Sequence, residues 1–125
     1  MAQSDKKATG SAGEDAAAFS LAKEGFDVIA RNYRFGKFGE IDIIAREKEY
    51  ICFIEVKTRK GNLFGTPSEA VGRRKQDRMK RLAWMYIRKC GLEGCSVRFD
   101  VVEVTGRHGP KGFEPTEINL IRNAF

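Results

Sequence analysis

The feature that most constrains this chain is a pair of neighbouring segments that read as β-strands although each carries charge at alternate positions. In chain order, the charged residues are Glu40, Asp42, Glu55 and Lys57. A polar stretch, residues 46–49, lies between the two segments and favours a hairpin turn. Because successive side chains of a strand point to opposite faces, all four charged residues are predicted to share one face of a sheet.

The register of this hairpin decides which charges meet. With the turn centred between residues 48 and 49, the numbers of paired residues sum to 97, so Asp42 faces Glu55. By the same rule Glu40 faces Lys57. Directly opposed side chains have Cβ atoms about 4.5–5.5 Å apart, and two carboxylates held that close repel unless a proton or a cation lies between them. The carboxylate pair therefore predicts a site for Mg²⁺ or Mn²⁺, which prefer oxygen ligands.

The uncharged positions of the two strands are predicted to form an apolar face that packs in the core: Ile41, Ile43, Ala45, Cys52, Ile54 and Val56. Helices before and after the strands are expected to cover both faces of the sheet, so the charged face needs a structural or a functional reason. An ion pair between Glu40 and Lys57 is one structural reason. It leaves the pairing of Asp42 with Glu55 unexplained.

The rest of the chain predicts an α+β fold in which helices flank a mixed central sheet. Residues 1–12 read as a disordered tail, and residues 13–125 as a single domain. The first half is expected to form a helix over 13–24 that begins with a capping box and ends at Gly25, a strand over 26–34, a turn over 35–39 and the charged hairpin. The second half is expected to form a loop over 58–68, a helix over 68–89, a strand over 95–104, a loop over 105–114 and a short edge strand over 117–121.

The net charge of +6 suggests a polyanionic partner, most often nucleic acid, although many small proteins are basic without one. The charge is concentrated on the predicted helix over residues 68–89, which carries eight Lys or Arg residues against two acidic ones. A solvated helix face is the plainer interpretation of such a run. The residues predicted to contact phosphates, from this helix and the loop before it, are Arg59, Lys60, Arg73, Arg74, Lys75 and Arg78.

Several other classes of protein are disfavoured. No apolar run approaches the length of a membrane span, and the N-terminus lacks the apolar segment of a signal peptide, so we expect a cytoplasmic protein without a membrane partner. One histidine and three scattered cysteines do not build a tetrahedral zinc site. A Ser-His-Asp device would depend on His108 alone, and no glycine-rich nucleotide loop is present.

The charged hairpin resembles the motif of the PD-(D/E)xK nuclease superfamily, in which an acid on one strand precedes an acid-x-Lys triplet on the next. Asp42 matches the first acid and Glu55-Val56-Lys57 the triplet, while Ile41 replaces the proline. Glu14 matches a helical acid found upstream in many members, although closing the capping box is a sufficient structural role for it. The order of helix, three-strand meander, helix and strand is also similar to the superfamily core, which is of the restriction-endonuclease type.

A closer resemblance, covering about residues 13–121, is to the YraN-like family, which is similar to archaeal Holliday junction resolvases. The matching segments are Gly13-Glu14, Asn32-Tyr33-Arg34, Gly39-Glu40-Ile41-Asp42 and Glu55-Val56-Lys57-Thr58-Arg59. The resemblance implies a metal-dependent DNA endonuclease, with branched DNA among the candidate substrates and a homodimer as the form that cuts two strands.

In that interpretation Asp42 and Glu55 bind the metal, with the Val56 carbonyl and Glu14 as further ligands. Lys57 positions or deprotonates the attacking water or stabilises charge, and Gln76 reaches the site from the second helix. Two alternatives stay open: a nucleic-acid-binding module that has the same fold without turnover, and a scaffold that docks an acidic protein.

Overall fold

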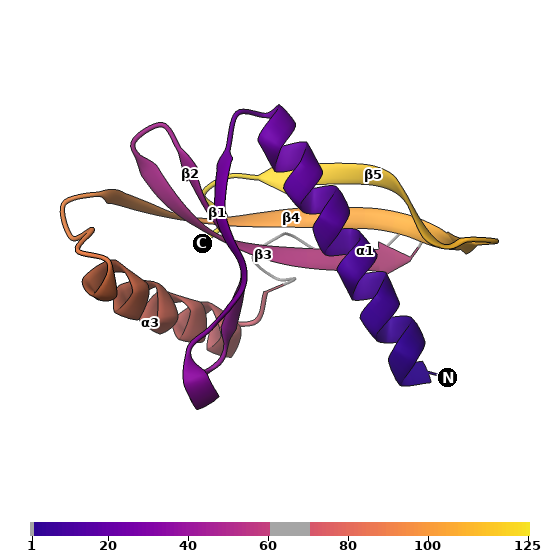
Figure 1. The fold of residues 1–125 in the computed structure, drawn as a ribbon, viewed down its shortest axis with the longest axis horizontal. Coiled ribbons are helices and arrows are strands. Elements are labelled where there is room, and N and C mark those ends of the chain that lie inside the picture. Colours follow the sequence, from indigo (N-terminus) through magenta and orange to yellow (C-terminus); the bar gives the residue numbers. More distant parts are fainter. Residues whose placement is uncertain (1, 61–70) are drawn as a thin grey trace.

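The computed structural model describes residues 2–60 and 71–125, which form a mixed five-stranded sheet between two helices (Figure 1). In chain order the elements are α1 (Ala2–Lys23), β1 (Asp27–Arg34), the 3-10 turn η1 (Gly36–Phe38), β2 (Glu40–Glu47), β3 (Tyr50–Lys60), α3 (Arg73–Lys89), β4 (Ser96–Gly109) and β5 (Gly112–Ile121). The strands lie in the order β1-β2-β3-β4-β5. Only the β3–β4 pair among them is parallel. The predicted α+β class with a mixed sheet is therefore confirmed.

The β2–β3 hairpin has the predicted register, since its pairs Ile43↔Ile54 and Glu47↔Tyr50 both sum to 97. The ladder ends at Ile43↔Ile54, so Asp42 lies one residue beyond it. The prediction that Glu40 pairs with Lys57 is wrong for the same reason. Beyond the ladder β2 pairs only with β1, where the Glu40 carboxylate lies 3.4 Å from Arg34.

Each face of the sheet packs against one helix, so both faces are apolar. Ile43, Ala45, Cys52 and Ile54 pack with Ala17 and Leu21 of α1, and Val56 lies at the edge of this cluster. Ile44, Ile51 and Phe53 pack with the buried side of α3. Ile41 was predicted on the first of these faces but packs on the second. Strict alternation fails there because β2 separates from β3 at Asp42.

Helix α1 begins at Ala2 rather than near Gly13, so the helix includes most of the segment that its composition assigned to a disordered tail. The capping box predicted a helix start near Gly13. The segment before it contains no proline, so nothing in its backbone prevents the helix from starting earlier. Gly13 is buried against β3, and a Cβ atom at this position would overlap the Thr58 side chain. Its lack of a side chain lets α1 approach β3 closely and brings the next residue, Glu14, toward the charged strands.

The second half of the chain follows the prediction in its helix and differs in its loops. Helix α3 buries the predicted apolar stripe of Met79, Leu82, Ala83, Tyr86 and Ile87. Its predicted start, Ser68, and most of the preceding loop lie outside the described residues. The loop was expected from residue 58, yet β3 continues to Lys60 because it pairs with β4 along its length. The segment 105–114, also predicted as a loop, is the tip of the β4–β5 hairpin, whose turn lies between the paired residues Gly109 and Gly112 (φ 102°). Within the described part of the chain, no helix is long and apolar enough to cross a membrane.

A buried carboxylate pair beside a basic helix

Asp42 and Glu55 are brought together where β2 leaves β3. The Asp42 Oδ2 atom accepts a hydrogen bond from the backbone N–H of Val56, 2.9 Å away, in place of the next ladder bond. Glu55 is only 3% exposed, and Asp42 is partly buried. The proximity of these two carboxyl groups was the sharpest prediction from the sequence, and it is confirmed, although they meet just past the end of the ladder rather than as a ladder pair.

The electrostatics of this pair are unfavourable for two ionised carboxylates. Burial, together with the charge of Glu55 and a hydrogen bond to it, raises the pKa of Asp42 to about 8. The Val56 N–H lowers this pKa and the charge of Glu14 raises it, both by less. At neutral pH Asp42 is therefore largely protonated. A buried carboxyl group with a pKa this far from its ordinary value is more common at functional sites than elsewhere.

Two lysines bind the other member of the pair. The Lys57 ammonium lies 3.7 Å from Glu55 Oε2, and Lys75 of α3 forms an ion pair with the same oxygen. Lys75 was predicted to contact phosphates; the structure adds this ion pair with Glu55, and phosphate contact stays a prediction. The sequence held a signal for it: Lys75 precedes the buried Met79 by four residues, which puts both side chains on one side of the helix.

Glu14 and Gln76 are the other two side chains that were predicted for the site. Glu14, on α1, is near enough for its charge to act on Asp42. Gln76, on α3, donates a hydrogen bond of 2.7 Å to the Val71 carbonyl, at the start of its own helix. Among the described residues, no group of three or more Asp, Glu, His or Cys side chains is arranged to hold a metal ion.

The donor set at the pair nevertheless suits a hard divalent cation. Two carboxylates from adjacent strands supply the oxygen ligands that Mg²⁺ and Mn²⁺ prefer. Burial and the charge of Glu55 raise the pKa of Asp42 and so favour its protonated form, and the ammonium of Lys75 compensates the charge of Glu55. A metal that displaced them would neutralise the same carboxylates. The donor types of Asp42 and Glu55 are therefore compatible with the metal that the sequence predicted, and binding of a metal stays a prediction.

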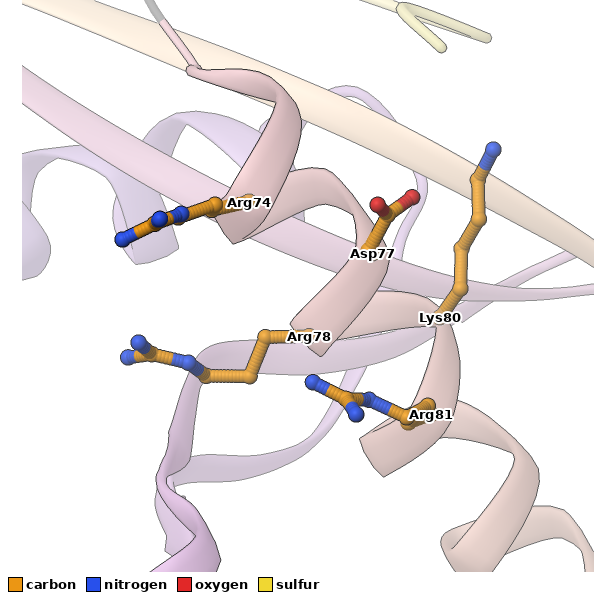
Figure 2. Close-up of a pocket in the computed structure, with 5 residues that line it drawn as sticks. All are labelled: Arg74, Asp77, Arg78, Lys80 and Arg81. Atoms are coloured by element: carbon orange, nitrogen blue, oxygen red, sulfur yellow. The ribbon is translucent and has the colours of Figure 1, made fainter.

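The basic residues predicted to contact phosphates divide into two groups. Arg59 is mostly buried and lies 3.3 Å from Glu103, and the side chain of Lys60 is outside the described part of the chain. On α3, Arg73 is exposed and lies 3.8 Å from Asp77. Arg74 and Arg78 line a surface hollow on α3 together with Asp77, Lys80 and Arg81 (Figure 2). Phosphate contact stays a prediction for the exposed arginines of this hollow, whereas Arg59 is paired in the fold.

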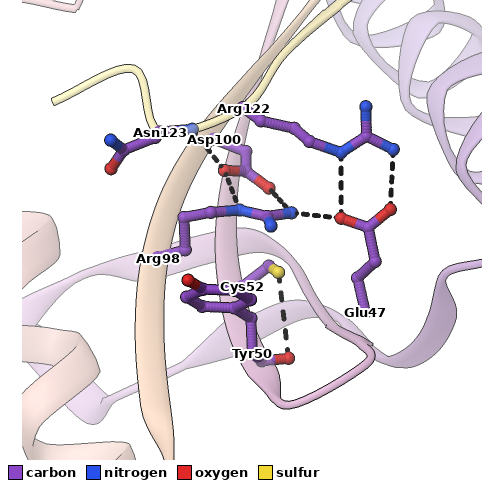
Figure 3. A network of polar contacts seen from close by, with 7 residues as sticks. All are labelled: Glu47, Tyr50, Cys52, Arg98, Asp100, Arg122 and Asn123. Carbon is purple, nitrogen blue, oxygen red and sulfur yellow. Dashed lines mark hydrogen bonds and ion pairs between the residues drawn. The ribbon is translucent and has the colours of Figure 1, made fainter.

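A second buried cluster of charges lies where β2 ends and β3 and β4 begin (Figure 3). Arg98 donates two hydrogen bonds to Asp100, at 2.8 and 2.9 Å, and one of 2.6 Å to Glu47. Arg122 donates two more to Glu47. These bonds from Arg122, and then those from Arg98, lower the pKa of Glu47 to about 2 despite partial burial. The sequence analysis missed this cluster, although an Arg and an Asp two residues apart in an otherwise apolar strand were its signal.

A mixed sheet with a buried carboxylate pair, two lysines and an arginine-rich helix defines an α+β protein with a polar site at the sheet. Comparison with known proteins adds its family: the chain belongs to the uncharacterised protein family UPF0102, whose model matches residues 13–104. The matched range contains both carboxylates, both lysines and all of α3. Family membership agrees with the YraN-like resemblance found in the sequence.

Similar proteins extend over almost the whole chain. A UPF0102 protein of Acetivibrio thermocellus is 46% identical over 123 residues, covering 98% of this chain and 95% of the relative. A UPF0102 protein of Symbiobacterium thermophilum is 50% identical over 116 residues, covering 93% and 94%. One from Caldanaerobacter subterraneus is 41% identical over 125 residues and covers all of both chains.

Proposed function

We propose that this protein is a metal-dependent nuclease of the PD-(D/E)xK type that hydrolyses phosphodiester bonds in DNA. The observation that carries the proposal is the pair of carboxyl groups, Asp42 and Glu55, held together in a buried position with Lys57 bound to the second. A structural ion pair does not need two acids, and the raised pKa of Asp42 makes the arrangement unfavourable for folding. Such an arrangement is expected where a cation and a substrate are bound.

We propose the following roles for the side chains at this site. Asp42, once deprotonated, and Glu55 would hold Mg²⁺ or Mn²⁺; the Val56 carbonyl and Glu14 are the proposed further ligands, the latter directly or through water. When bound, the metal would lower the pKa of a coordinated water and stabilise negative charge on the phosphate. From its place beside Glu55, the Lys57 ammonium would orient the attacking water or stabilise charge on the phosphate; it could accept a proton from the water only after losing its own to solvent. Gln76, at the start of α3, orients groups at the edge of the site.

The substrate is proposed to be DNA bound through the exposed arginines of α3. Arg74 and Arg78 face solvent on this helix and are available for phosphates. The resemblance to Holliday junction resolvases extends the proposal to branched DNA and to a homodimer, since cutting two strands of a junction needs two sites. The cytoplasm, where DNA and Mg²⁺ are both present, is the proposed location.

One observation favours a second candidate, a nucleic-acid-binding module without turnover. The Glu55 carboxylate already has Lys57 and Lys75 as partners, so its charge is compensated without a metal. In that case the basic surface of α3 would bind DNA while the carboxylate pair served only the fold.

A cleavage panel separates the two functions. Supercoiled, single-stranded and four-way-junction DNA are incubated with the protein and Mg²⁺ or Mn²⁺, and products are resolved on gels. We expect metal-dependent cleavage by the wild type and a loss of at least about 100-fold in Asp42→Asn and Lys57→Ala, because electrostatic and acid–base contributions of single groups are of this size. Asp27→Asn, at an exposed acid at the start of β1 and outside the arginine-lined surface, is the matched control for loss of an acid. Salt-sensitive DNA binding without cleavage, or equal rates in wild type and both variants, would favour the binding module.

A further inference from the structure

A second hollow, of about 270 Å³, lies between the turn η1 and helix α3, next to the arginine-lined surface. Its lining residues are Phe38, Arg78, Arg81, Leu82 and Met85. The Phe38 ring is 62% exposed and Met85 is 39% exposed. Exposed apolar side chains that are contiguous and bordered by charge mark interaction sites more often than isolated ones do.

The charge around this groove is positive and largely uncompensated. Arg74, Arg78 and Arg81 are spaced at i, i+4 and i+7, so they lie along one side of α3. Figure 2 shows the guanidinium groups of Arg74 and Arg78 extending to the same side of the helix, away from the Lys80 ammonium.

The acidic residues nearest the groove already have partners. Asp77 lies 3.8 Å from Arg73, and Glu40 lies 3.4 Å from Arg34. The ligand of this groove is therefore expected to be anionic and to carry an apolar, flat part that can cover Phe38.

We infer that the groove binds an unstacked nucleobase of a single-stranded or branched nucleic acid, with Phe38 as the stacking platform. The arginines on either side would contact the flanking phosphates, and Leu82 and Met85 form the apolar wall. This inference rests on the nucleic-acid-binding part of the proposed function and names its substrate class. Aromatic platforms combined with a basic track are the usual device for binding single strands, because every base has a π-face.

The position of the groove relates it to the carboxylate pair. Phe38 precedes Asp42 by four residues of turn and strand, which span at most about 14 Å. Arg78 packs over Gly39, the residue between the turn and β2. A base held on Phe38 would therefore belong to a nucleotide within a few positions of the one at Asp42. A fully paired duplex offers no free base face, so the groove selects for unpaired DNA close to the site of cleavage.

The test measures binding without any divalent metal, so that cleavage plays no part in it. Fluorescence anisotropy in EDTA compares an unstructured single-stranded oligonucleotide with a blunt duplex of the same sequence. For Phe38→Ala we expect about tenfold weaker binding of the single strand, from the loss of one base–aromatic stack, and less than a twofold change for the duplex. Phe38→Trp is expected to retain single-strand binding.

Trp84→Ala is the matched control, since Trp84 is an aromatic residue on α3 that is 57% exposed but lies outside the groove. We expect its affinities for both ligands to equal those of the wild type. A 2-aminopurine base in the single strand supplies a second readout, because stacking on Phe38 quenches its fluorescence and Phe38→Ala restores it. Equal weakening for single strand and duplex in Phe38→Ala, or no weakening, would overturn the inference.

The two proposals fail separately. A Phe38 effect on single-strand binding with no cleavage by wild type under any metal would leave the groove assignment standing and remove the nuclease assignment. Cleavage that needs Asp42 but does not change with Phe38 would do the reverse.

Discussion

The sheet contains two buried clusters of acidic and basic residues that are built on opposite principles. In the Arg98 cluster, made of Arg98, Asp100, Glu47 and Arg122, each carboxylate receives at least two hydrogen bonds from guanidinium groups (Figure 3). In the carboxylate pair, Asp42 faces another acid and receives one backbone hydrogen bond. The pKa of Glu47 falls to about 2, whereas that of Asp42 rises to about 8.

This contrast distinguishes charged groups that stabilise the folded state from charged groups that destabilise it at neutral pH. A carboxylate whose pKa is lowered stabilises the folded state above its unfolded pKa, and this contribution is lost as the pH falls through the folded value. A carboxyl group whose pKa is raised stabilises the folded state only at low pH, and the contribution is lost as the pH rises through the folded value. The first arrangement suits a structural link, and the second suits the cation site proposed above.

The largest expected difference between the two regions concerns the loss of one cation from each. Arg98→Met leaves Asp100, which is fully buried, with the N–H of Asn123 as its one remaining hydrogen-bond donor among the described residues, and should lower the free energy of unfolding by about 3–5 kcal/mol. Lys57→Met, in the carboxylate pair, should lower it by less than about 1 kcal/mol, because Glu55 keeps Lys75 and Lys57 is partly exposed. Urea unfolding at pH 7 measures both.

Similar losses for these two variants would break the comparison. It would mean that Lys57 is as much a part of the structural framework as Arg98. Arg98→Lys keeps the charge but cannot make both hydrogen bonds to Asp100. We therefore expect it to lower the free energy of unfolding by an intermediate amount.

The sequence allowed the carboxylate pair to be predicted because its determinants are local. A short turn sets the register of a hairpin, and period two then places Asp42 and Glu55 on one face. The stripe of α3 from Met79 to Ile87 was equally local. The spacing of Lys75 from Met79 could have assigned this lysine to the buried side of α3. The excess of Lys and Arg on the helix suggested a role at the surface instead.

The parts that were missed depend on contacts between distant segments. β3 extends to Lys60 because it pairs in parallel with β4, about 45 residues further along the chain. The polar residues from 58 to 60 had favoured a loop in the sequence. The Arg98 cluster joins residues from β2, β4 and the C-terminal end, and no local pattern links Glu47 to Arg122. The close approach of α1 at Gly13 likewise depends on Thr58, a residue of a different element.

A second prediction concerns the sign of the effect when an acid is neutralised. Asp42→Asn should stabilise the protein by about 2 kcal/mol at pH 8, since the amide keeps the hydrogen bond from Val56, can donate to Glu55 and carries no charge. The gain should be absent near pH 4, grow as the pH rises and level off above about 8, where Asp42 is ionised in the folded wild type.

Asp100→Asn should instead destabilise the protein, because the buried Arg98 loses one of its two ionic partners and keeps only Glu47. Unfolding curves for wild type and both variants at several pH values test this pair of opposite signs. A loss of stability in Asp42→Asn at pH 8 would mean that Asp42 is a structural acid like Asp100.

The smallest expected effect tests whether Lys75 occupies the place of a metal. Lys75 forms an ion pair with Glu55, so a cation that binds this carboxylate must first displace the ammonium. Lys75→Met removes that competitor and should tighten Mn²⁺ binding about tenfold at pH 8, equivalent to about 1.4 kcal/mol. Isothermal titration with Mn²⁺ measures the change, and Lys80→Met, which removes a lysine from the exposed side of the same helix, is the matched control.

Weaker binding in Lys75→Met would show that this lysine supports the metal rather than competing with it, and identical binding in all three proteins would place the metal away from Glu55. The tightening expected here has no counterpart in the Arg98 cluster, where the guanidinium groups complete the charge balance and leave no position for a divalent cation.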